Sequence, residues 1–191
     1  MDANARKQPD TEIERRFLLK TAPVNLKSFP KQRITQCYIS VSPVIRLRKT
    51  DSISMFDLPS ASRNDERFNG VSAKSDGVCQ TEMLYILTVK SKGALSRREF
   101  ELPLSKSEYK SLVKLKKTRF LKKTRFLVPC GRYIAYVDVF HGFLEPLKLC
   151  EVEFDSAGEA RAFAPPAWFG KEVTYNKRFT NSYLASHYKK F

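Results

Sequence analysis

The sequence predicts an α+β protein built on a large antiparallel β-sheet, and three observations support this prediction. At least six segments alternate apolar and polar residues with a period of two, as strands of an antiparallel sheet do. Helix signals are fewer and short. The 191 residues are 42% hydrophobic and 12% aromatic, which is enough apolar material for a folded core. We therefore expect one domain over residues 1–191.

The alternating segments place charged residues together on one face of each expected strand. In the first segment Glu12, Glu14 and Arg16 share a face, opposite Ile13, Arg15 and Phe17. The remaining strands are expected at 44–49, 85–90, 97–102, 133–140 and 150–155. Their charged pairs, each two residues apart, are Arg46 with Arg48, Glu99 with Glu101, and Glu151 with Glu153.

Three short helices are expected between and after the strands. Ser105 and Glu108 have capping-box spacing, and apolar residues then recur at helical intervals to about residue 117. Another short helix is expected after Thr21, and a third over 182–188. Residues 51–82 are rich in Ser, Asp, Asn and Gly and show little periodicity, so we expect a disordered insertion there.

One hexapeptide is repeated without change. Lys-Lys-Thr-Arg-Phe-Leu occupies 116–121 and again 122–127. Six residues preserve the side-chain face in a strand but not in a helix, so the duplication fits best at a helix-to-strand junction. Arg119 and Arg125 therefore compete for one structural position. We favour Arg125, because Phe126 and the residues after it lead straight into the strand expected at 133–140.

Charge and composition limit the classes of function. The 35 Lys and Arg against 20 Asp and Glu give a net charge of +15, which favours an anionic partner such as nucleic acid, a membrane surface or a phosphorylated small molecule. A basic, solvated exterior is the alternative reading. No apolar stretch approaches the roughly 18 residues of a membrane span, and the N-terminus lacks a signal-peptide core, so we expect a cytoplasmic protein with no membrane partner. The four cysteines are scattered without a CxxC motif, which argues against a zinc site or a disulfide framework.

The paired charges suggest phosphate chemistry. Two carboxylates two residues apart on a strand project in parallel, about 6.5–7 Å apart at the backbone, and can share a hard cation such as Mg²⁺ or Mn²⁺. Arginine pairs at the same spacing can hold successive phosphates. If these faces turn inward, the sheet encloses a polar cavity with the components needed for phosphoryl transfer. No GxxxxGK[ST] loop and no Rossmann glycine motif is present, so a glycine-rich phosphate cradle is excluded.

The charged motifs of the sequence resemble those of a known family. Glu12-Ile-Glu14-Arg-Arg16 is similar to the N-terminal ExExK signature of the CYTH superfamily, the triphosphate tunnel metalloenzymes. The resemblance extends, in the family's order, over most of the chain outside 51–82. Its other motifs are Arg46-Leu-Arg48, Leu87-Thr-Val-Lys90, Arg97-Arg-Glu99-Phe-Glu101, Tyr136-Val-Asp138, Cys150-Glu-Val-Glu153 and Gly170-Lys-Glu-Val-Thr174, followed by Arg178 and Asn181.

The resemblance implies an eight-stranded antiparallel barrel, a tunnel that binds a triphosphate and a divalent cation, Mg²⁺ or Mn²⁺. It implies catalytic roles for Glu12, Glu14 and Arg16. The implied metal-site residues are Glu12, Glu14, Glu151 and Glu153, with Asp138 and Glu99 or Glu101 in support. The implied phosphate-binding residues are Arg46, Arg48, Lys90, Arg97, Arg125 and Lys171, although Lys171 could equally be a solvated loop lysine.

The chain departs from the signature at Arg16, where the family has Lys. A guanidinium is wider than an ammonium and stays protonated, so we expect binding to survive while rate or substrate preference changes. The favoured function is metal-dependent hydrolysis of inorganic tripolyphosphate or thiamine triphosphate. The alternatives are a class IV adenylate cyclase, an RNA 5′-triphosphatase, and a non-catalytic module that binds polyphosphate or RNA through the basic surface.

Overall fold

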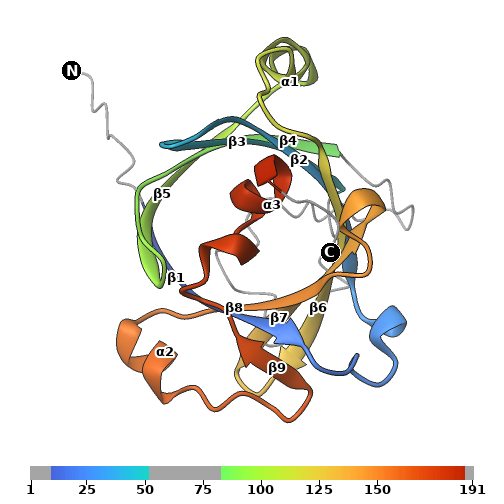
Figure 1. Cartoon of the computed structure of the whole chain (residues 1–191), viewed down its shortest axis with the longest axis vertical. Coiled ribbons are helices and arrows are strands. Elements are labelled where there is room, and N and C mark those ends of the chain that lie inside the picture. The colour runs from blue at the N-terminus through green and yellow to red at the C-terminus, as the bar shows by residue number, and fades with distance from the viewer. Residues whose placement is uncertain (1–9, 52–82, 188–191) are drawn as a thin grey trace, which may run out of the picture.

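The computed structural model describes residues 10–51 and 83–187, and in them an antiparallel β-barrel of eight strands with one additional strand (Figure 1). The strand order around the sheet is β5-β4-β3-β2-β6-β7-β8-β1-β9, and a further pairing of β5 with β1 closes the ring. The strands are β1 (Asp10–Leu19), β2 (Lys31–Val41), β3 (Val44–Asp51), β4 (Met83–Lys90), β5 (Ser96–Pro103), β6 (Leu121–Cys130), β7 (Tyr133–His141), β8 (Lys148–Glu153) and β9 (Phe169–Glu172). This architecture confirms the expected α+β class and the eight-stranded barrel.

Strand β1 closes the barrel by changing partners along its length. Its first half, Asp10 to Ile13, pairs with β5, while Glu14 to Leu18 pairs with β8 on the other side. Beyond Ser96, the first residue of β5, strand β9 takes its place beside β1, with Phe17 opposite Glu172. Strand β9 therefore extends the sheet beyond the ring and is not one of the eight barrel strands.

The helices cover the outside of the barrel in two places. Helix α1 (Lys106–Val113) packs Tyr109 against Cys37 and Leu47 on the outer face of β2 and β3. Helix α2 (Ala157–Ala162) lies on the opposite side of the ring, where Ala160 joins a larger apolar cluster with Phe17 (Figure 1). The rest of that cluster consists of Phe126, Val128, Cys130, Ala135, Val137, Cys150, Val152, Phe154 and Phe169. These apolar side chains pack on the outer face of the sheet, which leaves its charged face turned inward.

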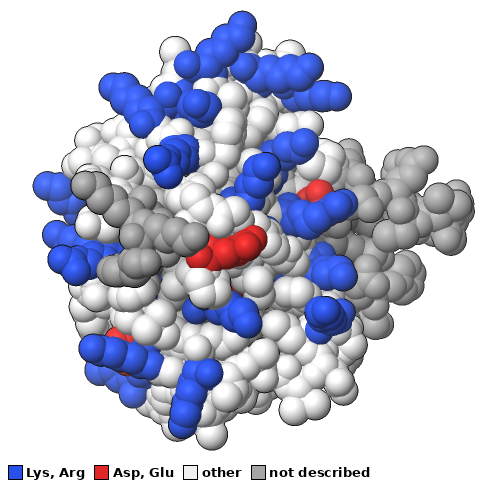
Figure 2. Space-filling view, turned by 45° about the vertical axis from the view of Figure 1, so that its right-hand side comes forward, with Lys and Arg blue, Asp and Glu red and all other residues white. Residues whose placement is uncertain are grey.

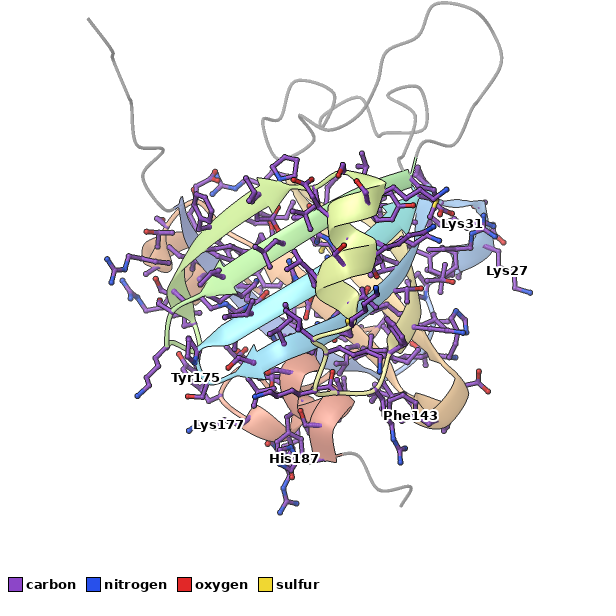
Figure 3. The ribbon with its side chains drawn as sticks, turned by 90° about the horizontal axis from the view of Figure 1, so that it is seen from above. Lys27, Lys31, Phe143, Tyr175, Lys177 and His187 are labelled. Carbon is purple, nitrogen blue, oxygen red and sulfur yellow. The ribbon has the colours of Figure 1, made fainter. Side chains whose placement is uncertain are left out.

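Helix α3 (Asn181–His187) lies at one end of the barrel. Figure 1 shows it inside the outline of the ring, and Figure 3 shows Tyr175 and Lys177 at the same end as His187, the last residue of this helix. Its Leu184 and Ala185 pack with Tyr38, Leu121 and neighbouring apolar residues. Three 3-10 turns, η1 (Leu26–Ser28), η5 (Gly142–Leu144) and η6 (Lys177–Phe179), complete the described elements. No helix in the described ranges is long and apolar enough to cross a membrane.

The six strands expected from alternation are all present, but β2, β6, β9 and α2 were not predicted. Helix α1 has the expected capping box at Ser105 and Glu108, yet it ends at Val113 rather than near residue 117. The hexapeptide repeat lies where a helix leads into a strand, as expected: its first copy follows α1, and its second copy lies in β6. Asp51 is the last residue of β3, and the rest of the insertion expected at 51–82 lies outside the described residues.

Candidate active site

The barrel encloses a cavity of about 1540 Å³ whose wall is dense in charge. The cations that the strands supply to it are Arg16, Arg46, Arg48, Lys90, Arg97, Lys123 and Arg125, and the carboxylates that they supply are Glu12, Glu14, Glu99, Glu101, Glu151 and Glu153. Asp138 is fully buried beside Lys123 and Arg125 and adds a seventh carboxylate. Positive and negative groups are therefore nearly balanced inside the barrel. These residues reach the inner surface because side chains two residues apart on a strand point to the same face, and the sheet closes into a barrel with that face inside.

Strands β1 and β8 form a wall on which the guanidinium of Arg16 lies between glutamate carboxylates. Arg16 and Glu151 are register partners, and Arg16 Nε donates to Glu151 Oε1 at 2.9 Å. The other end of the guanidinium donates to Glu14, two residues earlier on the same strand. Burial disfavours the charge on Arg16, but the two carboxylates outweigh it and raise its pKa. The backbone N–H of Arg16 donates to Thr174 Oγ1 at 3.0 Å, which anchors β1 to the segment after β9.

Strands β4 and β5 direct two cations at Glu12. Lys90 Nζ lies 2.8 Å from Glu12 Oε2, and Arg97 Nε donates to the same oxygen at 2.7 Å. Burial would raise the pKa of Glu12, but these cations overcome it and lower the pKa. Lys90 also pairs with Glu99 at 2.7 Å, and Arg97 with Glu14 at 2.9 Å. Each cation thus bridges two carboxylates.

Strand β3 supplies two arginines that are incompletely paired. Arg46 donates to Thr88 Oγ1 at 2.8 Å and to Glu101 at 3.0 Å, and Arg48 donates to Glu101 at 3.3 Å. The Nε–H groups of both arginines are buried without a hydrogen-bond partner among the described residues. A buried guanidinium N–H without an acceptor costs stability, which makes this pair the clearest sign that an anion belongs in the cavity. Burial, together with the neighbouring Arg46, lowers the pKa of Arg48 to about 10.

Strands β6 and β7 hold a second group of ion pairs. Arg125 donates to both oxygens of Asp138, each at 2.8 Å, and to Glu151 at 2.5 Å. Lys123 donates to Asp138 at 2.5 Å. Burial and the nearby Arg125 lower the pKa of Lys123 to about 8. Asp138 does not line the cavity, and its bonds orient the two cations that do.

Glu99 is a cavity carboxylate whose pKa is raised. Burial raises its pKa to about 7, and the nearby Glu12 adds to the rise, while Lys90 opposes it. Glu12 adds to the rise because both carboxylates pair with the ammonium of Lys90 and so lie close together.

The structure gathers all but two of the expected site residues on the wall of one cavity. The first exception, Asp138, lies directly behind that wall. The second, Lys171, is exposed on β9 and does not line the cavity, because β9 lies outside the ring of eight strands. Arg125 lines the cavity and Arg119 is exposed, so the second copy of the repeat occupies the interior position.

Several polar cavity residues were not found from the sequence. Gln36 and Tyr38 line the wall from β2, where Gln36 donates to the Tyr38 hydroxyl at 2.7 Å. Burial raises the pKa of Tyr38 beyond its usual range. Lys123 could have been identified, since it lies two residues before Arg125 and so shares its face. Thr174 carried no comparable signal.

The carboxylates suit a hard divalent cation by their chemistry, although they do not form a ready-made ligand set. Glu14 is the register partner of Glu153, with Glu12 and Glu151 next to them on the same wall. Carboxylate oxygens are the ligands preferred by Mg²⁺ and Mn²⁺. Within residues 10–51 and 83–187, however, no three acidic, histidine or cysteine side chains converge as a metal-binding group. Glu12, Glu14 and Glu151 instead turn toward cations of the wall.

Comparison with known proteins identifies the family. No protein-family model matches the chain. It is 37% identical over 178 residues to an inorganic triphosphatase of Nitrosomonas europaea, covering 92% of this chain and 97% of the relative. An inorganic triphosphatase of Acetivibrio thermocellus is 32% identical over 108 residues, which cover 55% of this chain and 68% of that protein. The crystal structure of the inorganic triphosphatase NE1496 superposes with a TM-score of 0.55 at 30% identity, covering 93% of this chain and 96% of that one. This chain therefore belongs to the inorganic triphosphatase family.

Proposed function

We propose that this protein hydrolyses a terminal phosphoanhydride bond of a triphosphate inside the barrel, with inorganic tripolyphosphate as the preferred substrate and thiamine triphosphate as the alternative. The observation that carries the proposal is the pair of buried Nε–H groups of Arg46 and Arg48, which have no hydrogen-bond partner among the described residues, in a cavity whose strands supply seven cations. Phosphate oxygens are the acceptors that such guanidinium groups bind best. The relatives named inorganic triphosphatase support the same substrate class.

The cations of the wall would bind the phosphates by exchanging partners. In the structure Arg46, Arg48, Lys90, Arg97 and Arg125 are paired with carboxylates. When a triphosphate enters, its oxygens replace those carboxylates as acceptors, so the charged groups stay paired during binding. Arg46 and Arg48 are two residues apart on one face, which lets them hold neighbouring phosphates. Exchange of this kind avoids the cost of burying a charge alone.

The carboxylates released by this exchange would hold the divalent cation. The residues suited to this role are Glu12, Glu14, Glu151 and Glu153, and Glu99 and Glu101 would support it from β5. A bound Mg²⁺ or Mn²⁺ supplies neutralisation of phosphate charge and activation of a water molecule. Because the wall is nearly neutral, a triphosphate without its cation would bring several uncompensated negative charges into the cavity. We therefore expect the substrate to bind as a complex with the divalent cation.

Arg16 would act at the centre of this arrangement. It lies between Glu14 and Glu151, so it is within reach of groups assigned to the cation and of the space for the phosphates. Its charge is fixed, so its role is to orient these carboxylates and to bind a phosphate oxygen, and it does not transfer a proton.

A phosphate-release assay tests the proposal. Tripolyphosphate, thiamine triphosphate and ATP are each incubated with the protein in Mg²⁺, in Mn²⁺ and in EDTA. We expect rapid release from tripolyphosphate with a divalent cation and none in EDTA. Equal turnover in EDTA, or no release from any of the three, would overturn the proposal, and cyclic AMP as the product from ATP would favour a cyclase instead.

A further inference from the structure

The first copy of the hexapeptide repeat does not contribute cations to the cavity and instead belongs to a basic exterior surface. Its Lys116, Lys117 and Arg119 are exposed in the segment between α1 and β6. Lys106, Lys110 and Lys114 precede them at intervals of four residues, which places them on one face of α1 and its C-terminal cap, about 6 Å apart along the axis. We call these six residues the basic track.

The charges of the basic track are not compensated nearby. None of the salt bridges between described residues involves any of its six side chains. Glu108 is the single acidic residue between Glu101 and Asp138, and its carboxylate is engaged in the capping box with Ser105. In Figure 2, Lys and Arg gather over the part of the surface where α1 lies, and Asp and Glu are sparse there.

The basic track ends beside the barrel mouth that carries α3. The backbone N–H of Arg119 donates to the carbonyl oxygen of Ala185 in α3, at 3.3 Å. The Arg119 guanidinium lies 5.3 Å from the centre of the Phe143 ring. Figure 3 shows Phe143 at the same end of the barrel as His187. A ligand that follows the track is therefore led toward this end of the cavity.

We propose that the basic track binds a chain of inorganic polyphosphate longer than the triphosphate that fits in the cavity. The interior of the barrel is nearly neutral, so the net charge of +15 lies almost entirely outside it. There it attracts an anionic partner other than the bound triphosphate. Five of the six track residues are lysines, which act as point charges and suit a flexible phosphate chain without a fixed geometry. Two aromatic rings beside the track, Phe120 and Phe143, lie under the charged groups of Lys116 and Arg119. The track therefore presents charge rather than stacking faces for bases, which favours polyphosphate over single-stranded RNA.

The proposal is tested with two triple variants of equal charge. The first replaces Lys116, Lys117 and Arg119 by Gln. The matched control replaces Lys20, Lys27 and Arg161 by Gln, which removes two lysines and one arginine from exposed sites away from α1. Binding of long-chain polyphosphate is measured by fluorescence anisotropy at about 0.1 M salt, where surface charges still interact over about 10 Å. A third variant, with Lys106, Lys110 and Lys114 replaced by Gln, tests the helical half of the track.

We expect the two track variants to bind polyphosphate about tenfold more weakly than the wild type, as three exposed charge contacts of modest strength would predict, and the control to bind nearly as the wild type does. All variants should hydrolyse tripolyphosphate at the wild-type rate, since none alters the cavity. Equal weakening in the control and the track variants would show an unspecific charge effect and overturn the proposal. It would also be overturned if the track variants lost affinity for a single-stranded RNA but kept it for polyphosphate. Because hydrolysis is measured separately, failure of the track would leave the proposed activity intact.

Discussion

Arg16 and Glu151 are direct register partners on β1 and β8, and their side chains form a buried ion pair with Nε and Oε1 2.9 Å apart. The same guanidinium bonds to Glu14, so one side chain ties together carboxylates from two strands. Both partners are about 95% buried, where an unpaired charge is costly. Arg16 is therefore part of the structure of the wall as well as a candidate for catalysis.

Replacing Arg16 by Lys should raise turnover on a triphosphate or shift the preference between tripolyphosphate and thiamine triphosphate, with KM changed less. The ammonium keeps the positive charge but contacts fewer oxygens, which leaves the carboxylates freer to hold a cation. Arg16→Ala should lower kcat/KM by roughly 10- to 150-fold, the range for one lost charge-assisted contact. Steady-state kinetics on the three proteins measure this. Unchanged kinetics in Arg16→Ala would contradict the assignment.

The neighbouring Arg15 is the internal control, because it points to the outside of the barrel. It donates to Glu172 at 2.7 Å and to the carbonyl oxygens of Ala160 and Phe163 at 2.9 and 2.8 Å. We expect Arg15→Ala to reduce the free energy of unfolding by about 1–3 kcal/mol, since these bonds fasten α2 to β1. Turnover below the melting temperature should be unchanged. A loss of activity in the folded Arg15 variant would mean that the opposite face of β1 carries the site.

The carboxylates of β1 and β8 should determine the requirement for a divalent cation. Glu12→Gln and Glu153→Gln keep the shape of each side chain but remove the charge that a hard cation needs. We expect each to reduce kcat roughly 100-fold or more and to raise the Mg²⁺ concentration needed for half-maximal rate. Glu145→Gln, at an exposed site in the turn after β7, is the matched control. Wild-type metal dependence in both site variants would remove these residues from the cation site.

The pKa of Glu99 predicts a specific pH dependence of stability. The folded protein raises this pKa from 4.5 to about 7, so the proton on Glu99 favours the folded state. This contribution is fully present below about pH 4.5 and is lost as pH rises through about 7. The melting temperature of the wild type should therefore fall relative to that of Glu99→Gln between pH 5 and pH 8. A difference between the two proteins that stayed constant over this range would show that Glu99 ionises normally.

The sequence was sufficient to predict which side chains of an alternating strand share a face. It was insufficient to predict contacts that depend on how separate strands pair. Glu12, Glu14, Arg46, Arg48 and Glu151 could be placed on inward faces, because a period of two fixes the face once the strand is recognised. The pairing of Arg16 with Glu151 could not be predicted, since it depends on the register between β1 and β8. Likewise, nothing local to Lys171 indicates that β9 lies outside the ring.

Strand β2 shows a second limit of sequence analysis. Its Ile34, Gln36 and Tyr38 face the cavity, while Thr35 and Cys37 face outward. Neither set is strongly polar or strongly apolar, so the alternation is weak in the sequence even though the strand is eleven residues long. Strand β6 was not predicted for another reason: its residues 122–127 repeat the sequence of 116–121, so the local sequence does not show where the strand begins.

Removal of the segment between β3 and β4 should leave the barrel folded. Asp51 and Met83 are register partners, so the two strand ends are already adjacent and can be joined by a two-residue Asn-Gly turn in place of residues 52–82. Loop length changes the closure free energy by only about 0.6 kcal/mol for each doubling. We expect a small change in melting temperature and nearly unchanged hydrolysis of tripolyphosphate. An unfolded product, or a large drop in melting temperature, would show that the deleted residues contribute to the core.

The hexapeptide repeat offers a comparison in which the local sequence is constant and only the position in the fold differs. Arg125 makes two bonds to Asp138 and one to Glu151 inside the barrel, whereas Arg119 is exposed over Phe143. Lysine cannot reproduce the forked contacts of Arg125, so Arg125→Lys should lower kcat/KM for tripolyphosphate about 10- to 100-fold. Arg119→Lys keeps an exposed charge and should have no effect on this reaction. Assaying both variants beside the wild type decides the matter: if Arg119→Lys were the damaging change, the first copy would supply the cavity residue and the register of β6 would be shifted by six residues.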